Sequence, residues 1–220
     1  MAIAGSDERF HDEIWALADF LMDPIRIIGV QEIFGVRPRW PQLTWAADGT
    51  KNATLRELFL SKDLADVKEL DFHDPRAELQ WDLNEPIPPE WYSSAHTLID
   101  IGSIEHIANT NQVLENYLRM TMLGGLIAIQ TPVKGYHGHG LYTFSPEVLI
   151  ETLKKNGCEL IYLKYCTDGG TEVQVTMNEE TGTWKFPDDP YILIWIVARK
   201  FKKTTDFVTI QQRYYQQEAQ

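Results

Sequence analysis

The stretch "LIDIGSIEHIANTNQVLENYLRMTMLGGLIAIQTP", Leu98 to Pro132, contains a strand, a helix and a second strand in one continuous run. An apolar strand is expected over 95–103, where it ends in Gly-Ser. The segment 108–123 has helical spacing, with one apolar side formed by Val113, Leu114, Tyr117 and Leu118. Gly124-Gly125 is expected to end that helix, and an apolar strand follows at 125–132. This order predicts two parallel strands joined by a helix.

The same alternation extends outward along the chain. Further strands are expected at 25–30, 65–72, 77–83, 158–166 and 189–201, and further helices at 7–22, 52–64 and 145–157. Strands that alternate with helices indicate a mostly parallel sheet with helices on both faces. No helix separates the last two strands, so we expect them to pair as a hairpin with the last strand antiparallel.

These elements predict a single α/β domain over residues 1–220, with a doubly wound, Rossmann-like sheet of seven strands. An N-terminal helix lies within 1–24, the core occupies 25–200, and 201–220 forms a tail whose segment 208–220 is expected to be a surface helix or a frayed end. The helix at 145–157 has a clear start, because Ser145 suits the N-cap and Pro146 the first helical position. Asn52 or Thr54 is expected to cap the helix at 52–64.

Composition narrows the class of partner. The formal net charge is −12, which argues against nucleic acid and anionic membranes as partners. Cys158 and Cys166 stand eight residues apart on one expected strand, too far to bridge, so we expect free thiols in a reducing compartment. No apolar run has the length of a membrane helix, and the acidic N-terminus lacks the apolar region of a signal peptide. These features indicate a cytoplasmic protein.

Polar residues and glycines collect where the expected strands end, which is where doubly wound sheets bind ligands. They are Gly29 with Gln31, then Asp71, Asp82, and Gly102 with Ser103. A carboxylate after the second strand suits a ribose diol, and one after the third suits an exocyclic amine such as that of adenine. A glycine after the first strand lets backbone approach a ligand closely. Together these residues predict a site for a cofactor that carries a nucleoside.

The central stretch resembles the second half of the class I S-adenosylmethionine-dependent methyltransferases. The resemblance is carried by Asp100, Glu105-His106, Arg119 and Gly124-Gly125. "LQWDLNEPIP", 79–88, is similar to the acidic adenine motif of that family. "GHGLYTFSPEVL", 138–149, is similar to a loop in a glycine-poor bacterial subgroup that modifies glycans and natural products. The resemblance covers about residues 25–166, and the last strand fits the antiparallel seventh strand of the fold.

One motif departs from the family pattern. The family usually has a G-x-G-x-G loop after the first strand, whereas this chain has only "IRIIGVQEIFG" there. The resemblance still implies a role for each strand end. Gly29 and Gln31 would lie near the methionine part of the cofactor, and Asp71 would bind the ribose. Asp82 and the backbone of Leu83 would contact the adenine, and Gly102 and Ser103 would lie under the sulfonium. It also implies that Glu105 and His106 face the site.

Histidines are the expected bases, because the usual pKa of histidine lies close to working pH. His106, His137 and His139 are the candidates, with His139 first. The simpler alternative is that His139 only pins its loop, and that Glu105 only caps a helix start. His137-x-His139 could also bind a metal, but no third ligand stands nearby in sequence, so we expect none.

Three residues are expected to contact the substrate: His137, Tyr142 and Arg37. Tyr142 follows the His-x-His pair, and Arg37 lies close to the expected cofactor end, where it could bind a phosphate or carboxylate. The predicted function is methyl transfer from S-adenosylmethionine to a small polar acceptor, first to oxygen of a sugar or related metabolite, next to nitrogen. The alternatives are a degenerate subunit that serves as a binding partner and an NAD(P)-dependent oxidoreductase. Oligomerisation is left open.

Overall fold

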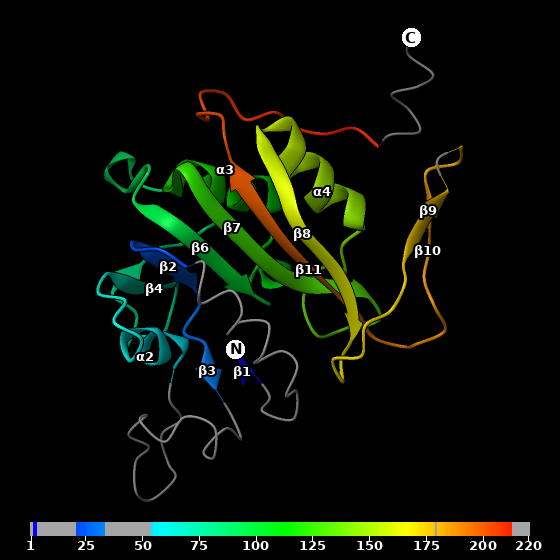
Figure 1. Ribbon diagram of the computed structural model, residues 1–220, viewed down its shortest axis with the longest axis horizontal. Helices are drawn as coiled ribbons and strands as arrows, with labels where there is room; N and C mark the ends of the chain where they lie inside the picture. The colour runs from blue at the N-terminus through cyan, green and yellow to red at the C-terminus, as the bar shows by residue number, and fades with distance from the viewer. Residues whose placement is uncertain (1, 4–20, 34–53, 179, 213–220) are drawn as a thin grey trace, which may run out of the picture.

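The computed structural model describes residues 2–3, 21–33, 54–178 and 180–212. Its centre is a seven-stranded sheet with the order β5-β4-β2-β6-β7-β11-β8 (Figure 1). The strands are β2 (Ile25–Ile28), β4 (Val67–Asp71), β5 (Leu79–Gln80), β6 (Ala95–Ile101), β7 (Thr121–Lys134), β8 (Cys158–Thr167) and β11 (Ile192–Lys200). The first five pair in parallel, and β11 is antiparallel to both β7 and β8. The predicted seven-stranded α/β fold is confirmed.

Helices cover the two faces of this sheet. α3 (Thr110–Met120) and α4 (Pro146–Lys155) pack on one face, and α2 (Leu55–Leu60) packs on the other (Figure 1). Two short 3-10 helices, η1 (Pro89–Trp91) and η2 (Ile104–His106), flank β6 in sequence. Small strand pairs stand outside the main sheet: β1 (Ala2–Ile3) with β3 (Glu32–Ile33), and β9 (Thr176–Asn178) with β10 (Thr183–Lys185).

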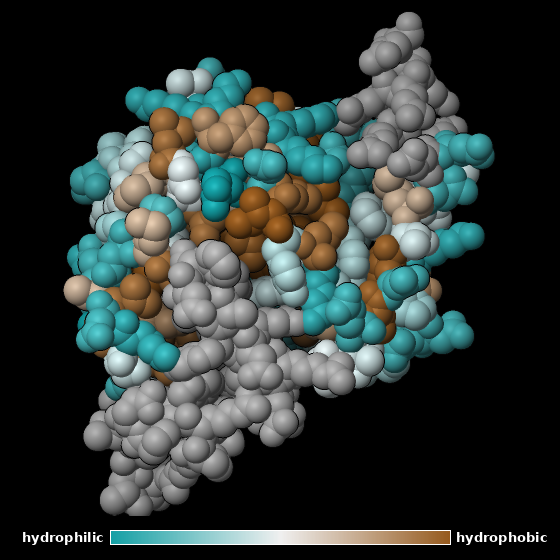
Figure 2. Space-filling model, viewed as in Figure 1, coloured by the Kyte–Doolittle hydropathy of each residue, from teal (hydrophilic) through white to brown (hydrophobic). Residues whose placement is uncertain are grey.

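Alternating side chains of the strands build two cores. Ile28, Leu98 and Ile127 belong to the core under α3 and α4, whereas Ile27 and Ile99 belong to the core under α2. Successive residues therefore point to opposite faces, as the period of a strand requires. Figure 2 shows further hydrophobic side chains at the surface over β7, β8 and β11.

The start of each short helix follows its local sequence. The Thr54 hydroxyl accepts from the Glu57 amide at 3.2 Å, and the Glu57 carboxylate accepts from the Thr54 amide at 2.9 Å. This reciprocal pair is a capping box, and it makes Thr54 the cap of α2. Ser145 and Pro146 stand at the N-cap and first position of α4 as predicted, although the Ser145 side chain makes no capping hydrogen bond.

The end of α3 differs from the prediction. The helix stops at Met120, β7 begins at Thr121, and Gly124-Gly125 lies inside β7 rather than at a helix end. The reason is a distant cap: the buried Lys200 ammonium on β11 donates to the carbonyls of Leu118 and Thr121. These carbonyls would otherwise lack partners at the helix end.

The structure requires a glycine at position 125 because of a close backbone contact, and not because a helix ends there. A Cβ at this position would lie 2.6 Å from the carbonyl oxygen of His96. The glycine therefore permits close approach of two backbone segments where β6 and β7 begin to pair.

Other parts of the prediction meet mixed outcomes. The expected strand at 77–83 is only two residues long, and the described part of the tail, 201–212, has neither helix nor strand. Most of the predicted N-terminal helix lies outside the described residues. Cys158 and Cys166 are buried free thiols, as predicted. Among the described residues, no helix has the length and apolar character needed to cross a membrane.

Candidate functional site

A cavity of about 290 Å³ opens where β2, β4, β5 and β6 end. Its volume is close to the lower limit of about 300 Å³ for small-molecule sites. The wall combines apolar side chains with carboxylates, an amide, a hydroxyl and an imidazole: Ile28, Gly29, Leu70, Asp71, Phe72, Trp81, Asp82, Leu83, Asn84, Ser103, His106 and Ile107. Five of the seven residues predicted to bind cofactor are in this wall, and Gln31 and Gly102 are not.

Gln31 fills the space beneath the loop that follows β2. Its buried side-chain amide donates to the Ile28 carbonyl at 3.0 Å and to the Ser103 hydroxyl at 3.4 Å. Gly29 has a φ of +76°, and a Cβ there would lie 2.9 Å from the Ser103 hydroxyl oxygen and 3.1 Å from the Gln31 amide nitrogen. Gly29 and Gln31 therefore form a tight turn after β2.

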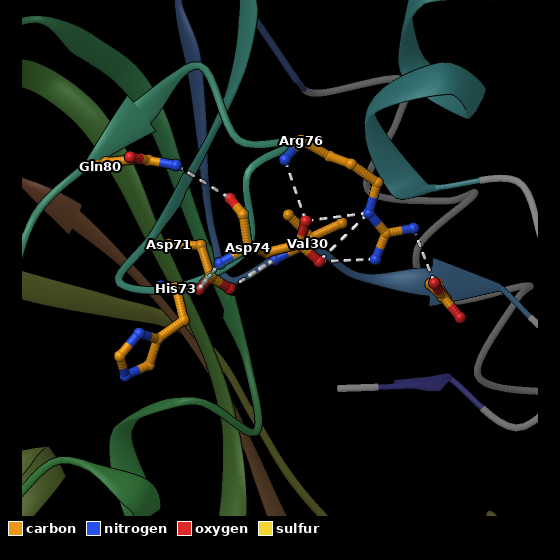
Figure 3. Close-up of polar contacts among 7 residues, drawn as sticks. Val30, Asp71, His73, Asp74, Arg76 and Gln80 are labelled. Atoms are coloured by element: carbon orange, nitrogen blue, oxygen red, sulfur yellow. Dashed lines mark hydrogen bonds and ion pairs between the residues drawn. The ribbon is translucent and has the colours of Figure 1, made fainter.

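Asp71 ends β4 with its carboxylate on the cavity wall (Figure 3). One oxygen accepts from the backbone amides of His73 at 2.8 Å and Asp74 at 3.0 Å, and the other accepts from the amide of Val30 at 3.2 Å. Burial opposes ionisation, but these amides outweigh it and lower the pKa of Asp71. The structure thus holds a charged carboxylate in a fixed orientation at the end of the strand.

Asp82 belongs to a turn that is tied to the start of α3. Its carboxylate accepts from the backbone and side-chain amides of Asn84 at 2.9 and 2.8 Å. The Asn84 side-chain oxygen then accepts from the Asn109 amide at 2.9 Å. Asn84 was not predicted as a site residue, although it stands only two positions after the predicted Asp82.

Two aromatic residues of the cavity wall, Trp81 and Phe72, were also not predicted as site residues. Trp81 packs edge-on against Trp91, with ring centroids 5.9 Å apart, and lies beside the predicted Asp82. Phe72 lies directly after Asp71, and its side chain is 56 % exposed. The sequence does place an aromatic residue next to each acid that ends a strand. Tryptophan is, however, more often a core residue than a ligand contact, so the sequence alone did not show which role Trp81 has.

The turn after β6 is organised by a buried carboxylate. Asp100 accepts from the amides of Ser103 at 2.8 Å and Ile104 at 3.1 Å, and from the Tyr117 hydroxyl at 2.7 Å. Complete burial nevertheless raises the pKa of Asp100 to about 6. Gly102 has a φ of +72° and is buried in this turn. The turn presents Ser103 to the cavity and leads directly into η2.

Glu105, His106 and His139 come together beside the cavity. Each offers a ligand or hydrogen-bonding atom, and these atoms lie within 4.8 Å of one another. The imidazole rings of His106 and His139 have centroids 5.1 Å apart. His106 and His139 are exposed at the surface, and partial burial of the His106 ring, with the neighbouring His139, lowers the pKa of His106. Burial, with the charge of Asp100, raises the pKa of Glu105 to about 7.

Of the other residues predicted to contact the substrate, Tyr142 adjoins this cluster through its backbone and His137 is not part of it. His137 is exposed, and the Tyr142 hydroxyl donates to the Ala108 carbonyl at 2.7 Å. That bond ties the loop after β7 to the loop after η2. Arg37 lies outside the described residues, so the structure gives no position for it.

No family model and no curated protein matches the sequence. Solved structures match the fold. A candidate methyltransferase from Bacillus halodurans C-125 has a TM-score of 0.54 and 10% identity, with 87% of this chain and 98% of that chain covered. Phosphoethanolamine N-methyltransferase 2 from Haemonchus contortus, in complex with phosphomonomethylethanolamine and S-adenosylhomocysteine, has a TM-score of 0.51 and 15% identity, with 88% and 53% covered.

A third structure shares the fold without being a methyltransferase by name. It is the branched-chain polyamine synthase from Thermus thermophilus, in complex with N4-aminopropylspermidine and 5'-methylthioadenosine. Its TM-score is 0.50 and its identity 15%, with 90% of this chain and 57% of that chain covered. At such identities the comparisons establish the fold of this chain, which is that of class I methyltransferases.

Proposed function

We propose that this chain is an S-adenosylmethionine-dependent methyltransferase that acts on a small polar acceptor, with oxygen of a sugar or related metabolite first and nitrogen next. One observation carries the proposal. Gly29, Asp71, Asp82, Leu83 and Ser103, each expected from the sequence to meet the cofactor, line a single cavity at the carboxyl ends of the strands. That edge is where sheets of this type bind nucleosides.

The wall of the cavity suits the parts of the cofactor. Three backbone amides occupy most of the acceptor positions of the charged Asp71 carboxylate, and its remaining lone pair, on Oδ2, can accept a hydrogen bond from a ribose hydroxyl. Asp82 and Asn84 supply polar atoms for an exocyclic amine, and Trp81 and Leu70 supply apolar surface for a purine ring. When bound, S-adenosylmethionine supplies a methyl group already activated by a sulfonium.

The chain then has to orient an acceptor and remove its proton. His106 lies both in the cavity wall and in the cluster with His139 and Glu105. Its lowered pKa keeps the imidazole neutral near pH 7, so it can accept a proton. His139 faces the same space from the loop after β7, and we assign it the role of acceptor-side base or anchor.

Thermal stability tests the class of cofactor. S-adenosylhomocysteine at about 100 times its Kd should add about 2.7 kcal/mol to the free energy of unfolding. For a chain of this size that corresponds to a rise of about 5–10 °C in Tm. NAD at the same concentration should leave Tm unchanged. A rise with NAD alone would favour an oxidoreductase, and no rise with either compound would favour a degenerate binding subunit.

A further inference from the structure

Glu105, His106 and His139 have the composition of a metal site. One carboxylate and two imidazoles offer ligand atoms within 4.8 Å of one another. Glu105 and His106 come from η2, after β6, and His139 comes from the loop after β7. β6 and β7 are parallel neighbours, so these two loops meet at the same edge of the sheet. Only His139 of the His137-x-His139 pair belongs to this cluster, and the other two ligands come from the loop after the adjacent strand.

The loop after β7 is fixed against Glu105 by its backbone. The amides of Leu141 and Tyr142 donate to the Glu105 carbonyl at 2.8 and 3.1 Å. Gly140 packs so closely that a Cβ there would lie 2.9 Å from that carbonyl oxygen. The Glu105 carboxylate is held in turn by the Thr131 hydroxyl, which donates to it at 2.9 Å. A supported carboxylate of this kind is what a metal ligand requires.

The charge around the cluster favours a cation. Glu105 is 1 % exposed and Asp100 is fully buried. Among the described residues, no lysine or arginine forms an ion pair with either carboxylate. Two buried carboxyl groups near one another repel when both are ionised, and a divalent cation would relieve that repulsion.

We propose that Glu105, His106 and His139 bind a divalent first-row transition metal, with Zn²⁺ as the reference ion. Two histidines and one glutamate form the ligand set of several catalytic zinc sites, which keep a further position open for water or substrate. Imidazole donors favour these metals over Mg²⁺ and Ca²⁺, which prefer oxygen ligands. His106 also lines the cavity, so the open position would face the bound ligand.

The role of this metal rests on the proposed function, but its binding does not. Coordination lowers the pKa of a hydroxyl, so an acceptor hydroxyl in the open position would release its proton to bulk water at neutral pH. The oxygen would then be ready to act as a nucleophile, and in the metal-bound protein His106 and His139 would serve as ligands and not as bases. Binding of the ion can be measured without any acceptor.

Metal titration of the tag-free protein tests the site directly. Zn²⁺ affinity is measured by competition with a chromophoric chelator, and Co²⁺ is added separately to record its visible absorption bands. His139→Ala and Glu105→Gln should each weaken Zn²⁺ binding by at least about tenfold and abolish the Co²⁺ bands. Glu105→Gln keeps an oxygen that can accept from Thr131, so it tests the charge with little change of shape.

His137→Ala is the matched control, because His137 is an exposed histidine of the same loop but not of the cluster. It should bind Zn²⁺ as the unmodified protein does. Equal loss in His137→Ala and His139→Ala, or Zn²⁺ binding unchanged in His139→Ala, would overturn the assigned ligands. S-adenosylhomocysteine binding is measured on the same samples after metal removal: its absence would overturn the proposed function, while the Zn²⁺ data decide the metal site separately.

Discussion

At the scale of single residues, Asp71 is positioned by backbone before any ligand arrives. Three amides, those of Val30, His73 and Asp74, hold its carboxylate at the cavity wall. Its pKa is lowered because these hydrogen bonds outweigh burial. A carboxylate that stays ionised and cannot rotate loses little entropy on meeting a diol. The prediction that an acid ends this strand followed from sequence, but the amides that orient it come from two separate loops.

Replacing this carboxylate should weaken cofactor binding. In Asp71→Asn, an amide replaces the charged group whose remaining acceptor position would meet a ribose hydroxyl, and one such charge-assisted hydrogen bond is worth about 1.5–3 kcal/mol. We expect S-adenosylhomocysteine to bind about 10- to 100-fold more weakly by isothermal titration calorimetry.

Asp74→Asn provides the comparison for that measurement. Asp74 stands three residues away, pairs with Arg76 at 2.6 Å and is not part of the cavity wall. Its substitution should change the affinity by less than about threefold, since an exposed ion pair contributes about 0–1 kcal/mol. Similar losses in the two variants would show that Asp71 acts through the fold of its turn and not through the ligand.

At the scale of elements, the loops after β6 and β7 bring together site residues whose contact could not be predicted from the sequence. Glu105-His106 and His139 were each identified as candidates, but the distance between them along the chain concealed their contact. What brings them together is Gly140, which packs on the Glu105 backbone. Local patterns predict strands and helices, whereas this contact depends on the pairing of two strands and on the path of a loop.

The same distinction explains the end of α3. Gly124-Gly125 has the sequence expected at a helix end, yet α3 ends four residues earlier, where Lys200 of the distant strand β11 donates to backbone carbonyls. A lysine in an apolar strand does indicate that carbonyl acceptors lie nearby, because a buried ammonium needs hydrogen-bond partners. Which carbonyls would accept could not be read without the sheet order.

A methyl group on Gly140 should separate the two loops. In Gly140→Ala, the new Cβ would meet the Glu105 carbonyl oxygen at 2.9 Å and its Cγ at 3.0 Å. Overpacking of this kind costs about 1–3 kcal/mol, and we expect that loss in the free energy of unfolding measured with urea. Gly140 does not line the cavity, so S-adenosylhomocysteine affinity should stay within about threefold.

Gly138→Asn is the companion variant in the same loop. Gly138 has a φ of +84° and open space around its Cβ, and asparagine tolerates left-handed backbone better than other side chains. It should cost less than about 1 kcal/mol. A larger loss in Gly138→Asn than in Gly140→Ala would mean that backbone conformation, and not contact with Glu105, determines the position of the loop.

At the scale of the whole molecule, the apolar content of a strand agrees with its place at the centre or the edge of the sheet. The run "YILIWIVA", 191–198, is almost continuously apolar, and β11 lies between two other strands with both faces covered. Such runs are typical of central strands. β8 is the edge, and its middle residues, 161–163, are exposed. The antiparallel last strand was predicted correctly, and its insertion between β7 and β8 required the tertiary structure.

Buried carboxyl groups in both layers should make the whole fold sensitive to pH. Glu69 is 2 % exposed, and burial, together with the charge of Glu78, raises its pKa to about 7. Glu105, in η2, also has a pKa raised to about 7. In the unfolded chain both groups titrate near 4.5. The folded state therefore holds more protons than the unfolded state between about pH 4.5 and 7.

Stability should accordingly fall as pH rises through this window and level off above about pH 8. For the metal-free protein we expect the free energy of unfolding, from urea titrations, to drop by roughly 2–3 kcal/mol per group between about pH 5 and 8. Glu69→Gln removes one titrating group, so its profile should be flatter and its stability at pH 8 higher than that of the unmodified protein. Stability that instead rises with pH over this range would mean that both carboxylates are ionised and paired in the folded state.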